Sequence, residues 1–539
     1  MKTGKTVKVL LTAATAAGML AGCGSKTDTD TFRFASELDI QGMDSTVVDD
    51  GMSFNAIHAI TDGLTAVNEK GKTAPAIAKS WDVSDDGKTY TFHLRDAKWS
   101  NGDKVTANDF VYSWRKIIKD AGNYAYMLGN GGASVKNADA LMELGANATD
   151  EQMATLGVTA KDDKTLVVEL ENKVPYFTDL MAFPCYFPQN EKFVEKCGKN
   201  YGTKPEYTLS NGAYTMTKWI KGNKATFTKN DKYYDAKAVK TKNLEMFLVQ
   251  DPKTAAQNFD NGKVDYATIN STLVDKYKDK DTFTTFNEGY LFYLQLNFKN
   301  NTVANKNVRE ALAYAINRKD LCENVLKDGS KAATGFVPSQ LSTSPAGKDF
   351  RDDADKYVSY DQKKAQEYLD AAKKELGTDT ITIDLLYGTD ESPMDTMAEY
   401  LQGSFTKLKG LKVNMVATVK KDRIYNREAN GNFQVVCTRW GPDYADPTTY
   451  LNLATTDNSN NYGKYTSAKY DALMEQIQKE SDLTKRWDLM IQAEKVIMDD
   501  LAYVPVFEKG SAALKAKNVS GLVQVPVGTP YTFKYVKLK

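Results

Sequence analysis

The sequence predicts an α/β protein, because helix-like and strand-like patterns follow one another along the whole chain. Two helices are indicated by apolar residues at helical spacing, one by Val308, Ala311, Leu312, Ala315 and Ile316 and one by Met490, Ala493, Ile497 and Leu501. Strand-like runs lie at residues 224–228, 290–297, 380–386, 412–419 and 433–437. The 539 residues suffice for about three domains. The pattern alone leaves an α+β arrangement open.

A β-hairpin followed by a helix is predicted early in the chain. An Asp86-Gly87 turn precedes Tyr90, Phe92 and Leu94, which alternate as in a half-buried strand. Further on, Thr106 and Asp109 have the spacing of a capping box ahead of apolar residues at helical spacing. We therefore expect a helix that begins near Asn108.

The N-terminus has the features of a bacterial lipoprotein signal. Three lysines precede an uncharged run of 14 residues, from 9 to 22, which is too short to span a bilayer as a mature helix. The run ends in Leu20-Ala21-Gly22-Cys23, which resembles a lipobox, so we expect residues 1–22 to be removed and Cys23 to carry lipid. Residues 23–29 would form a polar tether.

Composition and cysteine spacing exclude several functions. With 70 basic and 70 acidic side chains, the chain has no basic field for nucleic acid, and two histidines are few for a metal centre. Cys185 and Cys197 are close enough in sequence to form a disulfide, whereas Cys322 and Cys437 lie in apolar patterns typical of buried thiols. No CxxC pair occurs, so no zinc site is expected.

Motifs of catalysis and cofactor binding are missing. Neither Gly71-Lys72-Thr73 nor Gly87-Lys88-Thr89 has the upstream glycine of a phosphate-binding loop, and a calcium-like Asp82-x-Ser84-x-Asp86-Gly87 segment has His93 where the bidentate Glu should stand. There is no Gly-x-Ser-x-Gly elbow and no HExxH. We therefore predict no enzyme, metal or cofactor, although 70 acids leave a carboxylate-pair enzyme open.

Residues 440–452 carry the functional prediction. The segment reads Trp440-Gly-Pro-Asp443-Tyr444-Ala-Asp446-Pro, directly after an apolar strand. It resembles the Trp-x-x-Asp-Tyr-x-x-Pro segment of bacterial extracellular solute-binding proteins of the oligopeptide/dipeptide/nickel class. Other stretches that resemble the same family occur in the family's order along the chain, at residues 38–44, 81–114, 210–219, 308–318, 461–463 and 504–506. They cover the mature chain from end to end.

The resemblance implies a two-lobed fold of the periplasmic-binding-protein type (type II), which closes on a ligand by a hinge and has an extra third domain. Lobe I would consist of residues 30–67, 204–292 and 505–539. The extra domain II would be 68–203, and lobe III would be 293–504. The chain would cross between the lobes twice.

The same resemblance assigns ligand contacts around the motif. Asp443 matches the aspartate that pairs with the α-ammonium of a bound peptide, whereas Asp446 fits a turn or cap before Pro447. Trp440 suits either the core or a pocket wall, and Tyr444 is expected to contact ligand. Arg439 departs from the small residue usual before this Trp. It would bind a ligand carboxylate or pair with Asp443 itself, and the latter would argue against the ammonium role.

Two further segments match ligand-binding positions of relatives. Gly51, Met52 and Ser53 match a lobe I strand that pairs with the backbone of bound peptide, although a surface turn explains the segment equally well. Tyr124 and Tyr126 match the place where the extra domain leans an aromatic ring over the ligand, with core packing as the alternative.

The sequence therefore predicts a lipid-anchored receptor on the extracytoplasmic face of the cell membrane. It would bind short peptides as a monomer and deliver them to the permease subunits of an ABC importer. A receptor of the same fold for a nickel chelate, haem, an oligosaccharide or a signalling peptide remains an alternative. A secreted hydrolase and an adhesin or folding helper are alternatives from other classes.

Overall fold

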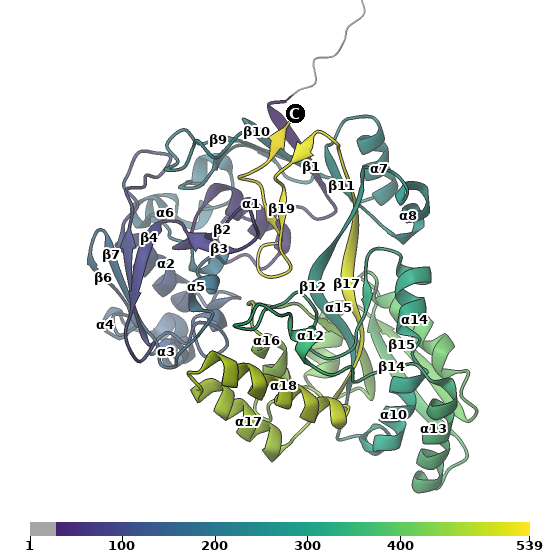
Figure 1. The fold of residues 1–539 in the computed structure, drawn as a ribbon. Helices are drawn as coiled ribbons and strands as arrows, with labels where there is room; N and C mark the ends of the chain where they lie inside the picture. The colour runs from purple at the N-terminus through teal and green to yellow at the C-terminus, as the bar shows by residue number, and fades with distance from the viewer. Residues whose placement is uncertain (1–28) are drawn as a thin grey trace, which may run out of the picture.

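A large mixed sheet runs through the whole molecule in the computed structural model, which describes residues 29–539 (Figure 1). The expected signal peptide and the lipidated Cys23 lie outside these residues. The sheet has the strand order β15-β14-β16-β12-β17-β11-β1-β10-β9-β8, with β13 paired to β17. In that order the strands are Leu411–Thr418, Ile381–Gly388, Val435–Trp440, Phe283–Leu296, Tyr503–Lys515, Tyr266–Ile269, Thr31–Ser36, Asn243–Leu248, Lys224–Lys229 and Tyr214–Ile220, and β13 is Lys331–Ala332. All five predicted strands are present among them.

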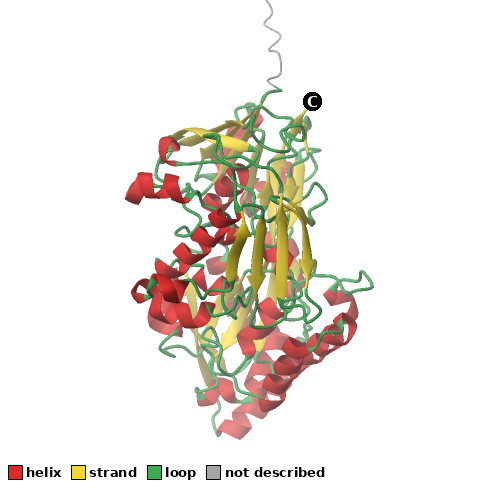
Figure 2. Cartoon of the chain, turned by 90° about the vertical axis from the view of Figure 1, so that its left-hand side faces the viewer, coloured by secondary structure: helices red, strands yellow, loops and turns green. Residues whose placement is uncertain are grey.

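Two long antiparallel strands, β12 and β17, join the two lobes. The first half of β12 pairs with the end of β17, where Phe283 lies opposite Leu514, and its second half pairs with the start of β17, where Leu294 lies opposite Val504. β11 continues the sheet at one end, and β16 continues it at the other. The register shifts between these halves, after Asn287, and such irregularities bend a strand. Figure 2 shows the strands running through the middle of the molecule.

Each lobe has its own hydrophobic core. In the lower lobe of Figure 1, helices cover the strands β12, β14 and β16, and these helices include α10 (Lys306–Ala315), α13 (Gln362–Leu376), α14 (Met394–Phe405), α17 (Ala468–Lys479) and α18 (Leu483–Asp499). The two helices predicted from apolar spacing are α10 and α18. The upper core is built on β1, β8, β9 and β10, with α1 (Gly51–Ile60) packed inside it. Helices α7 (Pro252–Asp260) and α8 (Ser271–Tyr277) flank the upper part of the sheet.

A separate four-stranded antiparallel sheet, β4-β5-β7-β6, lies beside the upper lobe (Figure 1). Its strands are Ala78–Val83, Thr89–Leu94, Thr165–Glu169 and Val158–Asp162, and β4 and β5 form the predicted hairpin. Helix α2 (Ala107–Lys119) begins one residue before Asn108, and the predicted Thr106–Asp109 capping box is present. The shorter helices here are α3 (Ala138–Leu144), α4 (Asp150–Met153), α5 (Phe177–Leu180) and α6 (Glu191–Cys197).

Three short strand pairs complete the sheets, namely β2–β3 (Thr65–Val67 and Thr73–Pro75), β18–β21 (Val519–Ser520 and Lys537–Leu538) and β19–β20 (Val523–Gln524 and Tyr531–Thr532). Within residues 29–539, no helix combines the length and apolar character needed to cross a bilayer.

Candidate functional site

The loop after β16 is fixed by buried polar contacts. Asp446 accepts hydrogen bonds from the backbone N–H and the hydroxyl of Thr448, at 3.0 and 2.6 Å. The guanidinium of Arg486, on α18, also donates to both Asp446 oxygens, at 2.6 and 2.9 Å. Asp446 thus makes the turn that was one of its two expected roles, and a buried ion pair is added to it. Such a pair holds the loop, and therefore Asp443, in one position.

Asp443 is a half-buried carboxylate that has no cationic partner within the described chain. No Lys or Arg among residues 29–539 forms an ion pair with it, and its backbone N–H is bonded to Thr449 Oγ1 at 3.1 Å. Burial raises the pKa of Asp443 to about 7, and the nearby Tyr126 hydroxyl opposes that rise only in part. An ionised carboxylate in such a place is costly unless a cation arrives to pair with it.

Aromatic rings from another part of the chain face Asp443. Tyr124 and Tyr126 belong to a short 3₁₀ segment around Ala125–Met127, and their ring centroids lie 5.8 Å apart. Tyr124 also packs edge-on against Phe54 at 5.2 Å, so it belongs partly to the core. Tyr126 is 40% exposed, and Asp443 lies close enough to raise the pKa of its phenol. The structure therefore brings both predicted tyrosines to the same site as Asp443.

Tyr290 and Trp440 complete this wall of the site. Tyr290, on β12, lies against Gly441, where any side chain would collide with its ring. Trp440 stands opposite Leu291 in the β12–β16 pairing and packs against the lower core. Its indole N–H is buried and has no hydrogen-bond partner within the described chain. Trp440 is thus partly a core residue, and its unpaired indole N–H is covered by protein atoms in this conformation.

Arg439 does not pair with Asp443. Its Nε lies 3.4 Å from Oε1 of Glu391, and its guanidinium lies 4.8 Å from the centre of the Tyr290 ring. The alternative in which Arg439 neutralises Asp443 is therefore wrong. Glu391 follows β14 and is 48 residues away in the chain, so no local pattern could reveal it as the partner.

Tyr444 is not placed as expected. Its ring is 4% exposed and stacks on Tyr176, with centroids 4.1 Å apart and planes 4° from parallel. Its hydroxyl is bonded to Thr448 Oγ1 and Asn452 Nδ2, at 3.5 and 3.2 Å. Because both the ring and the hydroxyl are occupied by protein groups, Tyr444 is a packing residue rather than a ligand contact in this conformation.

The expected peptide-pairing strand at Gly51, Met52 and Ser53 is a helix instead. Helix α1 begins at Gly51, and Asp50 caps it by accepting from Ser53 N–H at 2.8 Å. Met52 and Ser53 are buried, and Ser53 Oγ accepts from the backbone N–H of Gln41 at 2.9 Å. Capping by Asp50 overrides the extended conformation that the resemblance implied.

Cys185 and Cys197 are both free thiols, so the disulfide that the sequence allows is not formed. Cys185 is fully buried, and burial together with the nearby Asp443 raises the pKa of the Cys185 thiol. Cys197 is the last residue of α6 and is partly exposed. Cys322 and Cys437 are buried, as expected. Among the described residues, no cluster of three or more His, Cys, Asp or Glu side chains has a metal-binding arrangement.

Three residues of the site were not found by sequence reasoning. Tyr290 and Tyr176 carry no motif, since each is one of 30 tyrosines in the chain. Glu391 likewise lies in no recognised segment. Only the pairing of β12, β14 and β16 brings Tyr290 and Glu391 next to the loop at 440–447.

The two-lobed fold, with a carboxylate and aromatic rings contributed by distant segments, defines a solute-binding protein. The profile of the bacterial extracellular solute-binding proteins, family 5 (middle region), matches residues 72–462. The chain belongs to this family.

Relatives cover the whole chain. It is 34% identical to a dipeptide-binding protein of Lactococcus lactis, with 100% of both chains covered, and 32% identical to the oligopeptide-binding protein OppA of Bacillus subtilis, with 90% of this chain and 88% of that one covered. The solved structure of Listeria monocytogenes OppA bound to peptide matches with a TM-score of 0.78 and 34% identity, covering 95% of this chain and 100% of that one. The pheromone receptor PrgZ also matches, with a TM-score of 0.78, 31% identity and coverage of 95% and 99%.

Proposed function

We propose that this protein is an extracytoplasmic receptor that binds oligopeptides and delivers them to an ABC importer. The observation that carries the proposal is Asp443, a half-buried carboxylate with a raised pKa that has no cationic partner among residues 29–539 and that shares its site with Tyr126. The α-ammonium of a peptide would supply the missing charge. No chemical step is assigned to the site.

A receptor that accepts many peptides must recognise what all peptides share. These common features are the charged ends and the backbone amides. A carboxylate and an ammonium form charge-assisted hydrogen bonds, each worth about 1.5 to 3 kcal/mol.

The names of the relatives support a peptide as the ligand. The matched proteins of Lactococcus lactis and Bacillus subtilis are called dipeptide- and oligopeptide-binding, and the Listeria monocytogenes structure contains a bound peptide. Their alignment with nearly the whole chain makes the same ligand class the best choice here.

The remaining parts of the proposal concern organisation. We assign residues 30–67, 204–292 and 505–539 to lobe I, residues 68–203 to domain II and residues 293–504 to lobe III, with closure around β12 and β17. The protein would act as a monomer, anchored by lipid on Cys23 after removal of residues 1–22, and would dock on the permease subunits of the importer.

A thermal-shift screen of the soluble chain from residue 24 tests the ligand class. Peptides of two to eight residues are compared with sugars, haem and a nickel–histidine complex. A ligand at a hundredfold excess over its Kd stabilises the folded state by about 2.7 kcal/mol, which raises the melting temperature. A shift with peptides alone supports the proposal, whereas a shift with only a non-peptide ligand rejects it.

A further inference from the structure

Arg439 is anchored on one side and free on the other. Its Nε is 3.4 Å from Glu391, and its guanidinium lies over the Tyr290 ring at 4.8 Å. Neither terminal guanidinium nitrogen donates a hydrogen bond to any residue in the described chain. The Arg439 side chain is 28% exposed, whereas that of Glu391 is 2% exposed. The part of Arg439 that can bind a carboxylate in bidentate fashion therefore faces solvent.

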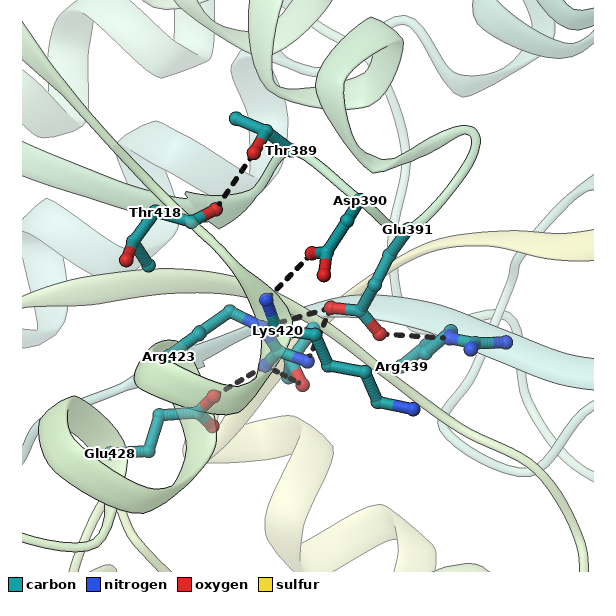
Figure 3. A network of polar contacts seen from close by, with 9 residues as sticks. Thr389, Asp390, Glu391, Thr418, Lys420, Arg423, Glu428 and Arg439 are labelled. Atoms are coloured by element: carbon teal, nitrogen blue, oxygen red, sulfur yellow. Dashed lines mark hydrogen bonds and ion pairs between the residues drawn. The ribbon is translucent and has the colours of Figure 1, made fainter. Parts of the chain in front are cut away.

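The carboxylate that anchors Arg439 is already engaged elsewhere (Figure 3). Oε2 of Glu391 accepts from Nε and Nη2 of the buried Arg423, at 3.1 and 2.8 Å. Arg423 also pairs with Glu428 and donates to Thr438 Oγ1 at 2.7 Å. Arg439 therefore makes one long contact with a carboxylate whose short contacts go to Arg423, and its two terminal nitrogens remain available to donate hydrogen bonds.

Arg439 and Asp443 act on the same part of the site. Both charges act on Tyr290: Asp443 raises the pKa of its phenol, and Arg439 lowers it. The two residues are four positions apart, so their Cα atoms are at most about 15 Å apart. An extended peptide advances about 3.5 Å per residue, so only a group within the first few residues of a ligand held at Asp443 lies in reach of Arg439.

We propose that Arg439 is a specificity-determining residue that binds a carboxylate near the amino end of the ligand. This inference rests on the proposed function, in which Asp443 holds the ligand's α-ammonium. Two sources offer the same chemistry, namely the terminal carboxylate of a di- or tripeptide and the side chain of an Asp or Glu close to the amino end. In such a ligand Asp443 binds the α-ammonium, and Arg439 binds the carboxylate.

Two pairs of peptides separate the sources. Ala-Phe is compared with Ala-Phe amide, and the amidated tetrapeptide Ala-Glu-Ala-Phe is compared with its Gln counterpart, each by isothermal titration calorimetry. We expect the carboxylate member to bind about 10- to 100-fold more tightly in at least one pair. A preference within the first pair indicates binding of the terminal carboxylate, and a preference within the second indicates binding of the Glu side chain.

The variants Arg439→Gln and Arg439→Lys test the residue itself. Arg439→Gln should bring the affinity ratio of the favoured pair close to one. Arg439→Lys should retain part of the preference, because the Lys ammonium keeps the charge but lacks the paired N–H donors of the guanidinium. Arg427→Gln is the matched control, since Arg427 is an exposed arginine on the neighbouring segment, paired with Asp422 at 3.3 Å, and should keep the wild-type ratio. Because each ratio compares two ligands on one protein, a loss of stability in a variant does not imitate the effect.

The outcomes separate this inference from the proposed function. If Arg439→Gln keeps the wild-type ratio, or if the wild type shows no preference in either pair although N-acetylation still weakens binding, the role of Arg439 is overturned and that of Asp443 stands. If N-acetylation has no effect on the wild type, the ammonium role of Asp443 fails, and the inference fails with it.

Discussion

The ring of Tyr444 stacks face to face on the ring of Tyr176, with centroids 4.1 Å apart. Tyr444 follows Asp443 in the chain, and Tyr176 precedes α5, in the segment matched to the extra domain that also contributes Tyr126. The stack therefore joins the two sides of the site, and the conformation described here has those sides in contact.

Replacement of Tyr176 by Ala should weaken peptide binding about 3- to 10-fold, because an aromatic pair contributes about 0.5 to 1.5 kcal/mol beyond its buried area. The loss should appear as faster ligand release in a stopped-flow or surface plasmon resonance measurement. Tyr176→Phe keeps the ring and is the control. An equal loss with Phe would show that the hydroxyl, rather than the stack, matters.

Peptide binding should weaken as the pH falls below 7. The pKa of Asp443 is raised to about 7 in the ligand-free protein, so its carboxylate is increasingly protonated there and cannot pair with an ammonium. The free α-amine has a pKa of about 8, so the tightest binding is expected between about pH 7 and 8. Kd measured from pH 5.5 to 9 checks this, and an affinity independent of pH between 5.5 and 7.5 contradicts it.

Asp443 should also cost stability in the absence of ligand. Its folded-state pKa is raised above the unfolded value near 4, so its contribution to stability is lost as the pH rises from about 4 through 7. Asp443→Asn should therefore stabilise the ligand-free protein at pH 8, by about 1 to 3 kcal/mol, and by much less at pH 5. Thermal unfolding at both pH values measures the difference.

Asp446→Asn is the matched comparison for that variant. It changes the same residue type three positions away, but it breaks the buried pair with Arg486, whose Nη1 lies 2.6 Å from Asp446. Loss of one partner of a buried ion pair costs about 3 to 5 kcal/mol. A fall in stability for both variants would contradict the view that Asp443 lacks a partner.

The two thiols should react differently in the native protein. Cys197 is partly exposed and should be modified by a maleimide within minutes, whereas Cys185 is fully buried and its thiol pKa is raised well above its usual range. Mass spectrometry of tryptic peptides locates the label. A Cys185–Cys197 disulfide-linked peptide in the non-reduced digest would contradict the free thiols.

Local sequence patterns predicted those helices and strands that are buried on one face and exposed on the other. The hairpin at Asp86-Gly87 and the start of α2 near Asn108 were found because turn and capping residues adjoin clear periodicity. The start of helix α1 was wrongly expected to be a strand. Every residue from Met52 to Ile60 is buried, so no amphipathic face marks the helix in the sequence. Asp50, which is a favoured helix-capping residue, was the signal that could have indicated the start of this helix.

The sequence placed candidate site residues in two segments, the motif at 440–446 and the pair Tyr124 and Tyr126. Asp443, Trp440 and Asp446 share a motif, and the structure places Asp443 beside Tyr126. The partners of Arg439 and Tyr444 could not be predicted, because Glu391 and Tyr176 reach them through strand pairing and packing between distant segments. Side-chain pairing across a fold depends on these long-range contacts rather than on spacing.

The most direct test of the account is a calorimetric cycle with one peptide and its N-acetylated form on the wild type and Asp443→Ala. The account predicts that the wild type binds the free peptide at least about tenfold more tightly than the acetylated one, and that Asp443→Ala binds both with similar, weak affinity. An equal loss of affinity for both peptides in Asp443→Ala would contradict the pairing of Asp443 with the α-ammonium.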